Sequence, residues 1–193
     1  MIIIHTQHYK KLNNIYLIGP MGSGKTSVGK WLANLIGNRF YDSDIEIEKR
    51  TGLNIPWIFE HEGEKIFRRR ETKIISSLCK LNNIILSTGG GAVLIEANRH
   101  HLSKNGIVVY LMVSAETQLK RITCTDKSRP LFIKHNSKEK LQKLNKEREI
   151  LYQTIADFTH STDSLKPHHL AIRILMDIKK FIKCAYEYHL PFC

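Results

Sequence analysis

The feature that most constrains this chain is the segment from Gly19 to Thr26, GPMGSGKT, which matches the pattern G-x-x-x-x-G-K-[ST]. A compact apolar run, Ile15 to Ile18, precedes it, and apolar residues at spacings of three and four follow from Lys25 to Ile36. The segment therefore joins a predicted strand to a predicted helix. In that context glycines let successive backbone N–H groups point at one anion, and the helix presents its positive N-terminal dipole. We predict a loop that binds the phosphates of a nucleoside triphosphate, rather than a plain glycine-rich turn.

Short apolar runs alternate with helical patterns along the rest of the chain. Further strands are expected at 39–41, 84–86, 107–112 and 157–162. Helical patterns run up to Gly52, within 56–80 with a break near Gly63, at 138–152 and at 171–182. The stretch 123–137 is polar and irregular, which predicts a mobile loop. This alternation predicts an α/β sandwich with a mostly parallel sheet. We expect one domain over 13–182, an N-terminal extension at 1–12 and a C-terminal tail at 183–193.

Composition excludes several classes of protein. The 193 residues carry a net charge of +12, which suits a binder of nucleic acid, of a membrane surface or of small anions. Lysines and arginines are spread along the whole chain, and the densest cluster, 68–70, has glutamates around it, which disfavours nucleic acid. The four cysteines lie far apart without zinc-site spacing, and neither a secretory signal nor a membrane span is recognisable. We expect free thiols and a cytoplasmic protein.

Four residues in and near the phosphate-binding loop are candidates for chemistry. Lys25 is expected to reach the outer phosphates, and the Thr26 hydroxyl to bind Mg²⁺. Asp42 and Asp44 follow the second predicted strand, at the sheet edge where open α/β folds bind ligands. One carboxylate can hold magnesium, directly or through water, and the other can accept a proton from a substrate hydroxyl. The alternative is that one aspartate only caps the following helix, but the neighbouring loop favours the functional interpretation.

Two other segments allow both a structural and a functional interpretation. The triplet Arg68 to Arg70 lies in a helical pattern, where it is either a solvated charged face or the source of one bidentate contact to a substrate carboxylate. Gly89 to Gly91 follows a predicted strand, where it is either a tight turn or a place where backbone N–H groups meet a ligand.

The motifs taken together resemble the shikimate kinase family over residues 13–163. They are, in order, G-P-M-G-S-G-K-T, F-Y-D-S-D with I-E-K-R-T-G, F-R-R-R-E, S-T-G-G-G, R-P-L and L-Y-x-x-I-A-D. The resemblance implies a three-layer P-loop kinase fold, like that of nucleoside monophosphate kinases, with a parallel five-stranded sheet. It also implies transfer of the γ-phosphoryl group of ATP to the 3-hydroxyl of shikimate, in the biosynthesis of chorismate and aromatic amino acids. Where the family often has R-x-P-L-Y, this chain has R-E-I-L-Y at 148–152.

The resemblance also implies a role for individual residues. It implies that ATP is bound by Gly22, Ser23, Gly24, Lys25, Thr26, Ser27, Arg121 and Arg129. It implies that Mg²⁺ is held by Thr26 and, in its outer sphere, Asp42. It implies that shikimate is bound by Asp44, Arg68, Gly89, Gly90, Gly91 and Arg148. Lys25, Asp44 as base and Arg129 from a lid over 123–137 would be catalytic, and Glu71 would orient Arg68.

Two rival functions remain at this point. A different small P-loop kinase would act on gluconate or a nucleoside monophosphate, although D-S-D, F-R-x-x-E and G-G-G together suit a small polyol acid. A non-catalytic nucleotide-dependent module, for example one that binds nucleic acid, would explain the positive charge but not the retained candidate residues. We therefore expect ATP and shikimate as partners of a monomer, with no nucleic acid and no membrane.

Overall fold

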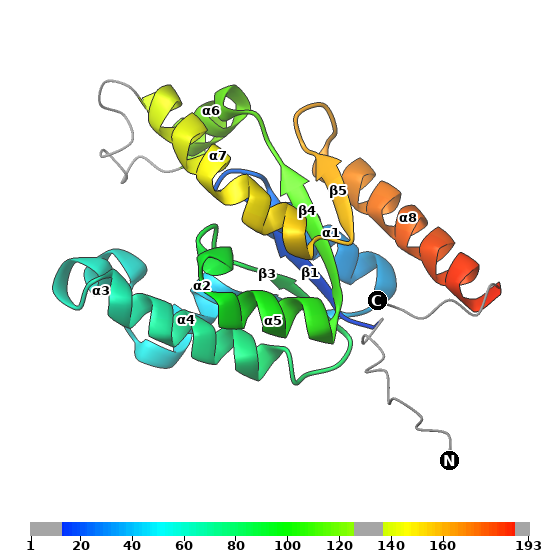
Figure 1. The fold of residues 1–193 in the computed structure, drawn as a ribbon, viewed down its shortest axis with the longest axis horizontal. Coiled ribbons are helices and arrows are strands. Elements are labelled where there is room, and N and C mark those ends of the chain that lie inside the picture. Colours follow the sequence, from blue (N-terminus) through cyan, green and yellow to red (C-terminus); the bar gives the residue numbers. More distant parts are fainter. Residues whose placement is uncertain (1–12, 126–136, 188–193) are drawn as a thin grey trace, which may run out of the picture.

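A computed structural model describes residues 13–125 and 137–187, and its centre is a five-stranded sheet (Figure 1). All neighbouring strands are parallel, and their order is β2-β3-β1-β4-β5. The strands are β1 (Ile15–Ile18), β2 (Arg39–Asp42), β3 (Ile84–Ser87), β4 (Ile107–Met112) and β5 (Phe158–Ser161). The predicted α/β class with a parallel five-stranded sheet is thus confirmed.

Helices cover both faces of this sheet. Helices α1 (Lys25–Ile36) and α8 (Pro167–Glu187) pack together on one face. The other connections are α2 (Ser43–Thr51), α3 (Ile55–His61), α4 (Glu64–Leu78), the 3₁₀ helix η1 (Ala92–Leu94), α5 (Glu96–Asn105), α6 (Ala115–Thr125) and α7 (Ser137–Ile155). Figure 1 shows α4, α5 and α7 on the side of the sheet opposite α8. The result is the expected three-layer sandwich.

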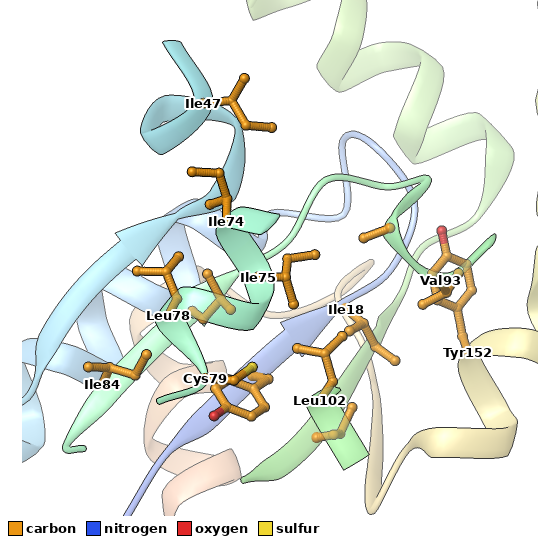
Figure 2. Close-up of a cluster of buried hydrophobic side chains, with 14 of the residues drawn as sticks. Ile18, Ile47, Ile74, Ile75, Leu78, Cys79, Ile84, Val93, Leu102 and Tyr152 are labelled. Carbon is orange, nitrogen blue, oxygen red and sulfur yellow. The ribbon is translucent and has the colours of Figure 1, made fainter. Parts of the chain in front are cut away.

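The alternation of side chains along β1 divides the core into two clusters. Ile15 and Leu17 pack with residues of α1 and α8, whereas Tyr16 and Ile18 pack with residues of α4, α5 and α7. Successive side chains of a strand point to opposite faces, so a central strand that is buried on both sides needs a continuous apolar run. Figure 2 shows the second cluster, with Tyr152 at its edge.

Some element boundaries differ from the expected ones. Helix α2 begins at Ser43, directly after β2, so Asp44 lies in its first turn. The reason is that Asp42 caps α2, since its carboxylate accepts a hydrogen bond from the Asp44 N–H at 3.1 Å. Helix α8 begins earlier than residue 171 and continues past 182 to Glu187. Residues 123–125 and 137 of the expected lid are helical, as the end of α6 and the start of α7, and the rest of it, 126–136, lies outside the described residues.

The carboxyl ends of β1 and β3 are neighbours at a point where the chain changes faces. The helix after β1, α1, belongs to the cluster on one face, whereas α5, after β3, belongs to the cluster on the other. Open α/β sheets bind ligands at such a switch point. The phosphate-binding loop and Gly89–Gly91 follow these two strands, so the fold brings both glycine-rich segments to one edge.

Candidate functional site

The loop after β1 has the backbone that its glycines allow. Gly22 has φ 73° and Gly24 has φ 84°, both in the left-handed region. Gly24 is the N-cap of α1, and within the described part of the chain no side chain caps this helix. The first N–H groups of α1 are therefore available to an anion at the positive end of the helix dipole. Ser27 is exposed in the first turn of the same helix.

Lys25 is buried against the carbonyl groups of its own loop. Its Nζ donates to the carbonyl oxygens of Gly19 at 2.9 Å and Pro20 at 2.8 Å, and to Ser23 Oγ at 3.3 Å. Burial lowers the pKa of Lys25 to about 8, and the charges of Asp44 and Asp42 act in the opposite direction. The effect of desolvation on this pKa is therefore larger than that of the two carboxylates. A bound polyphosphate would supply further negative charge beside the ammonium group and so favour its charged form.

Thr26 and Asp42 lie together beside Lys25. The Thr26 hydroxyl donates to Asp42 Oδ2 at 2.8 Å, while Asp42 Oδ1 accepts from the Asp44 N–H. Asp42 therefore caps a helix and contacts the loop at the same time, so the cap does not separate this carboxylate from the phosphate-binding loop. Among the described residues, no group of three or more His, Cys, Asp or Glu side chains could hold a metal ion by itself. A hydroxyl and one carboxylate suit Mg²⁺, which keeps several waters and takes phosphate oxygens as ligands.

The Gly89 to Gly91 segment is a tight turn that makes room for its neighbours. The carbonyls of Gly89 and Gly91 accept the N–H groups of Ala92 and Leu94 as η1 begins. A side chain at Gly89 would come within 2.8 Å of carboxylate oxygens of both Asp44 and Glu71. The interpretation of this segment as a tight turn therefore describes its backbone correctly. Because the glycines have no side chains, charged groups of neighbouring elements can approach this backbone.

The other two glycines of this turn contact different elements. A side chain at Gly91 would overlap the guanidinium of Arg68, and one at Gly90 would come within 3.0 Å of the backbone nitrogen of Met21 in the phosphate-binding loop. The turn thus lies directly against the loop after β1. A ligand bound to the glycine turn is therefore next to the phosphate-binding loop, and a ligand bound to that loop is next to the turn.

The three arginines of α4 have three different environments. Arg68 donates to Glu71 Oε2 at 2.8 Å and pairs with Glu64 at 3.0 Å. Arg69 is exposed, and Arg70 pairs with Glu62 at 2.7 Å. Only Arg68 reaches the glycine turn, so the charged-face interpretation fits Arg69 alone. The expected pairing of Glu71 with Arg68 is confirmed, and the pairing with Glu64 is an addition.

Glu71 is a fully buried carboxylate at this place. Burial raises its pKa; the charge and hydrogen bond of Arg68 lower it, and the charge of Asp44 raises it further. The Arg68 guanidinium is therefore held on its inner side by a group that cannot move into solvent. This fixes the guanidinium beside Gly91.

Arg148 lies on α7, which runs through Ile150 without a break. Burial raises the pKa of Tyr152, while the charge and hydrogen bond of Arg148 and the charge of Arg68 oppose the rise. The two predicted carboxylate-binding arginines, from α4 and α7, thus both act electrostatically on the Tyr152 hydroxyl.

Arg121 on α6 connects the loop after β1 to the loop after β5. Its guanidinium donates to the Gly22 carbonyl at 3.1 Å and to Thr162, through the hydroxyl at 2.9 Å and the carbonyl at 2.6 Å. Asp163 accepts from the N–H and hydroxyl of Ser114 and so ties the same loop to the start of α6. Arg121 is therefore fixed at the side of the phosphate-binding loop. Arg129 lies outside the described residues.

The predicted residues form two adjoining groups. The P-loop group comprises Gly22–Ser27, Asp42 and Arg121. The glycine-turn group comprises Asp44, Arg68, Gly89–Gly91 and Arg148. Sequence reasoning missed Ser43, whose buried hydroxyl accepts the Gly89 N–H at 2.9 Å, and it missed Thr162 and Tyr152. Of these, only Tyr152 carried a signal, because it belongs to the L-Y-x-x-I-A-D motif.

Comparisons with known proteins agree on one family. A family model described as shikimate kinase matches residues 21–179. The shikimate kinase of Coxiella burnetii (strain Dugway 5J108-111) is 62% identical over 172 residues, which cover 89% of this chain and 96% of the relative. That of Nitrosococcus oceani is 51% identical over 168 residues, covering 87% and 88% of the two chains. The solved shikimate kinase from Acinetobacter baumannii in complex with shikimate is 48% identical, covers 89% of this chain and 95% of its own, and has a TM-score of 0.83.

Proposed function

The chain belongs to the shikimate kinase family, so it is an ATP-dependent kinase that phosphorylates the 3-hydroxyl of shikimate, and we propose that its two residue groups divide this reaction. The P-loop group holds ATP, and the glycine-turn group holds shikimate. The observation that carries this division is the contact between the glycine turn and the phosphate-binding loop: a side chain at Gly90 would lie 3.0 Å from the Met21 backbone nitrogen. Two substrates bound to adjoining segments are held in the proximity that phosphoryl transfer needs.

On the ATP side, the backbone of Gly22–Gly24 and the N-terminus of α1 bind phosphate oxygens. Lys25 then exchanges its carbonyl contacts for the outer phosphates, whose charge compensates for its burial. Ser27 adds its hydroxyl at the first turn, and Arg121 lies beside the nucleotide. Thr26 and Asp42 would hold Mg²⁺, Asp42 through water. When bound, Mg²⁺ neutralises charge on the phosphate oxygens.

On the shikimate side, Arg68 and Arg148 bind the carboxylate, and the Gly89–Gly91 backbone lies against the ring. A planar guanidinium matches a carboxylate with two parallel hydrogen bonds. Glu71 supports the orientation of Arg68, because their pair is buried on the side away from the substrate. Asp44 contacts the substrate hydroxyls at the junction of the two groups.

The transfer itself is an in-line displacement. The 3-hydroxyl oxygen attacks the γ-phosphorus and forms a new P–O bond. The bond between the γ-phosphorus and the oxygen that bridges the β- and γ-phosphates breaks, and the hydroxyl proton goes to Asp44. The products are shikimate 3-phosphate and ADP. Lys25 and Arg129 neutralise charge on the transferring group, and the expected lid over 123–137 keeps water out.

We also propose the setting in which the enzyme works. It is a cytoplasmic monomer whose partners are ATP and shikimate, not nucleic acid or a membrane. Within the described residues, no helix has the length and apolar character to cross a membrane.

The experiment that tests this function offers ATP·Mg²⁺ together with shikimate, gluconate or AMP and measures ADP release. Only shikimate is expected to raise the rate above background hydrolysis. Stimulation by gluconate or AMP instead would identify a different small kinase. A steeply salt-dependent affinity for DNA without any acceptor-stimulated ADP release would identify a binding module.

A further inference from the structure

Tyr152 is a buried tyrosine at the edge of the glycine-turn group. It lies on α7, one helical turn after Arg148, and only 1% of its surface is exposed. Its ring stacks on Tyr110 of β4 with centroids 4.8 Å apart and an interplanar angle of 19°. The ring enters the large core cluster near Val93 (Figure 2). Packing alone would therefore accept a phenylalanine here, so the hydroxyl must have another role.

The Tyr152 hydroxyl donates to the carbonyl oxygen of Gly90 at 2.5 Å. Gly90 is the middle residue of the turn whose neighbours contact Asp44 on one side and Arg68 on the other. This bond connects α7 to the turn across 62 residues of sequence. A change in its length would move the turn, against which the Arg68 guanidinium lies, relative to α7, which carries Arg148.

Both carboxylate-binding arginines act on this hydroxyl. Burial raises the pKa of Tyr152, while the charge and hydrogen bond of Arg148 and the charge of Arg68 oppose the rise. The phenol is therefore a neutral donor that lies near two guanidinium groups. It is not among the groups that would touch the transferred phosphoryl.

We propose that Tyr152 is a positioning residue: its hydroxyl fixes the glycine turn to α7 and thereby sets the spacing of Arg68 and Arg148 for the substrate carboxylate. This inference rests on the proposed function, because it assumes that the two arginines bind shikimate. The proposed role predicts that loss of the hydroxyl weakens the binding of shikimate but not that of ATP, since the hydroxyl bonds to the turn and not to the loop that holds ATP.

The test is Tyr152→Phe, which removes the hydroxyl and keeps the ring. The KM for shikimate is expected to rise about three- to tenfold, since a hydrogen bond is lost and a carbonyl is left without its partner. The KM for ATP and kcat should stay within about twofold of the wild-type values, because the binding free energy is lost only on the shikimate side.

The matched control is Tyr16→Phe. Tyr16 is equally buried, and its hydroxyl donates to the Asn105 carbonyl at 3.0 Å and accepts from Asn14 Nδ2 at 3.1 Å, next to the amino end of β4. This variant should lower Tm about as much as Tyr152→Phe and leave both KM values unchanged. If Tyr152→Phe also changes only Tm, or raises both KM values together, the positioning role is wrong. Absence of shikimate-stimulated ADP release from the wild-type enzyme would instead reject the proposed function.

Discussion

Asp42 and Asp44 show how two identical side chains, two residues apart, acquire different roles. Asp42 ends β2, caps α2 and accepts the Thr26 hydroxyl. Asp44 lies in the first turn of α2, where its side chain faces Gly89. Because the helix cap is Asp42, a change at Asp44 can be made without removing the cap.

We predict that Asp44→Asn abolishes most of the phosphoryl transfer without unfolding the protein. Loss of a general base should lower kcat by about a hundredfold or more. The Kd for ATP should change little, and so should Tm, since the α2 cap remains. Single-turnover kinetics, ATP titration and thermal melting measure the three quantities. Asp42→Asn is the matched control: asparagine also caps helices, so this variant should raise the Mg²⁺ requirement instead. A kcat within tenfold of wild type for Asp44→Asn would reject its role as base.

Arg68 gives a second prediction at this scale. Replacement by alanine would leave the buried Glu71 without its partner and destabilise the fold, so lysine is the better substitution. Arg68→Lys keeps a positive charge beside Glu71 but loses the planar fork. We expect kcat/KM for shikimate to fall about 10- to 100-fold, the equivalent of about 1.5–3 kcal/mol for a charged hydrogen bond.

The control for Arg68 is its neighbour Arg69, which is exposed on the same helix. Arg69→Lys should leave kcat/KM for shikimate unchanged. Equal effects of the two substitutions would mean that the whole triplet acts as a charged face, and Arg68 would lose its assignment.

At the scale of elements, the decisive contact is between the turn after β3 and the loop after β1. The three glycines of the turn have no positive φ, so they are not needed for an unusual backbone conformation. They are needed because neighbouring groups occupy the space that side chains would fill. Each glycine should therefore respond differently to alanine, according to what its new side chain meets.

We predict that Gly91→Ala and Gly90→Ala affect different substrates. At Gly91 the added methyl group displaces the Arg68 guanidinium, so the KM for shikimate should rise about fivefold or more while the KM for ATP is unchanged. At Gly90 the methyl group meets the Met21 backbone nitrogen, which cannot turn away as a side chain can, so the KM for ATP should rise as well. Steady-state kinetics with each substrate varied in turn measures both constants. If Gly91→Ala raised the KM for ATP as strongly as that for shikimate, the two residue groups would not be separate.

At the scale of the whole molecule, the net charge of +12 acquires a meaning from the substrates. ATP and shikimate are both anions, and a positive protein attracts anions over distances of about a Debye length. The sequence alone gave three interpretations of this charge. The family to which the chain belongs favours the one in which small anions are bound.

We predict that kcat/KM for both substrates falls about two- to fivefold when salt rises from about 50 to about 200 mM, because screening weakens long-range attraction. The effect should be in KM, with kcat nearly constant, since the bound substrates are in direct contact with the enzyme. Initial rates at several salt concentrations and constant free Mg²⁺ measure it. A kcat/KM that does not depend on salt would show that the net charge has no part in substrate capture.

The local parts of this protein can be predicted from the sequence without the structure. The loop from Gly19 to Thr26 depends on left-handed glycines and on the start of α1, which are properties of neighbouring residues. The alternation of strands and helices likewise follows from short-range patterns of apolar residues. The motifs also indicate the activity, because together they resemble those of one family.

Contacts between residues that are distant in the chain follow from the tertiary fold and not from the sequence pattern. Gly91 lies against Arg68, Gly89 binds Ser43, and Tyr152 bonds to Gly90, although these partners are far apart in the chain. No local pattern encodes such contacts, because they depend on the order of the strands and on which face each helix covers. For the same reason the arginine triplet was ambiguous from sequence: its three members differ only in what the folded chain places beside each of them.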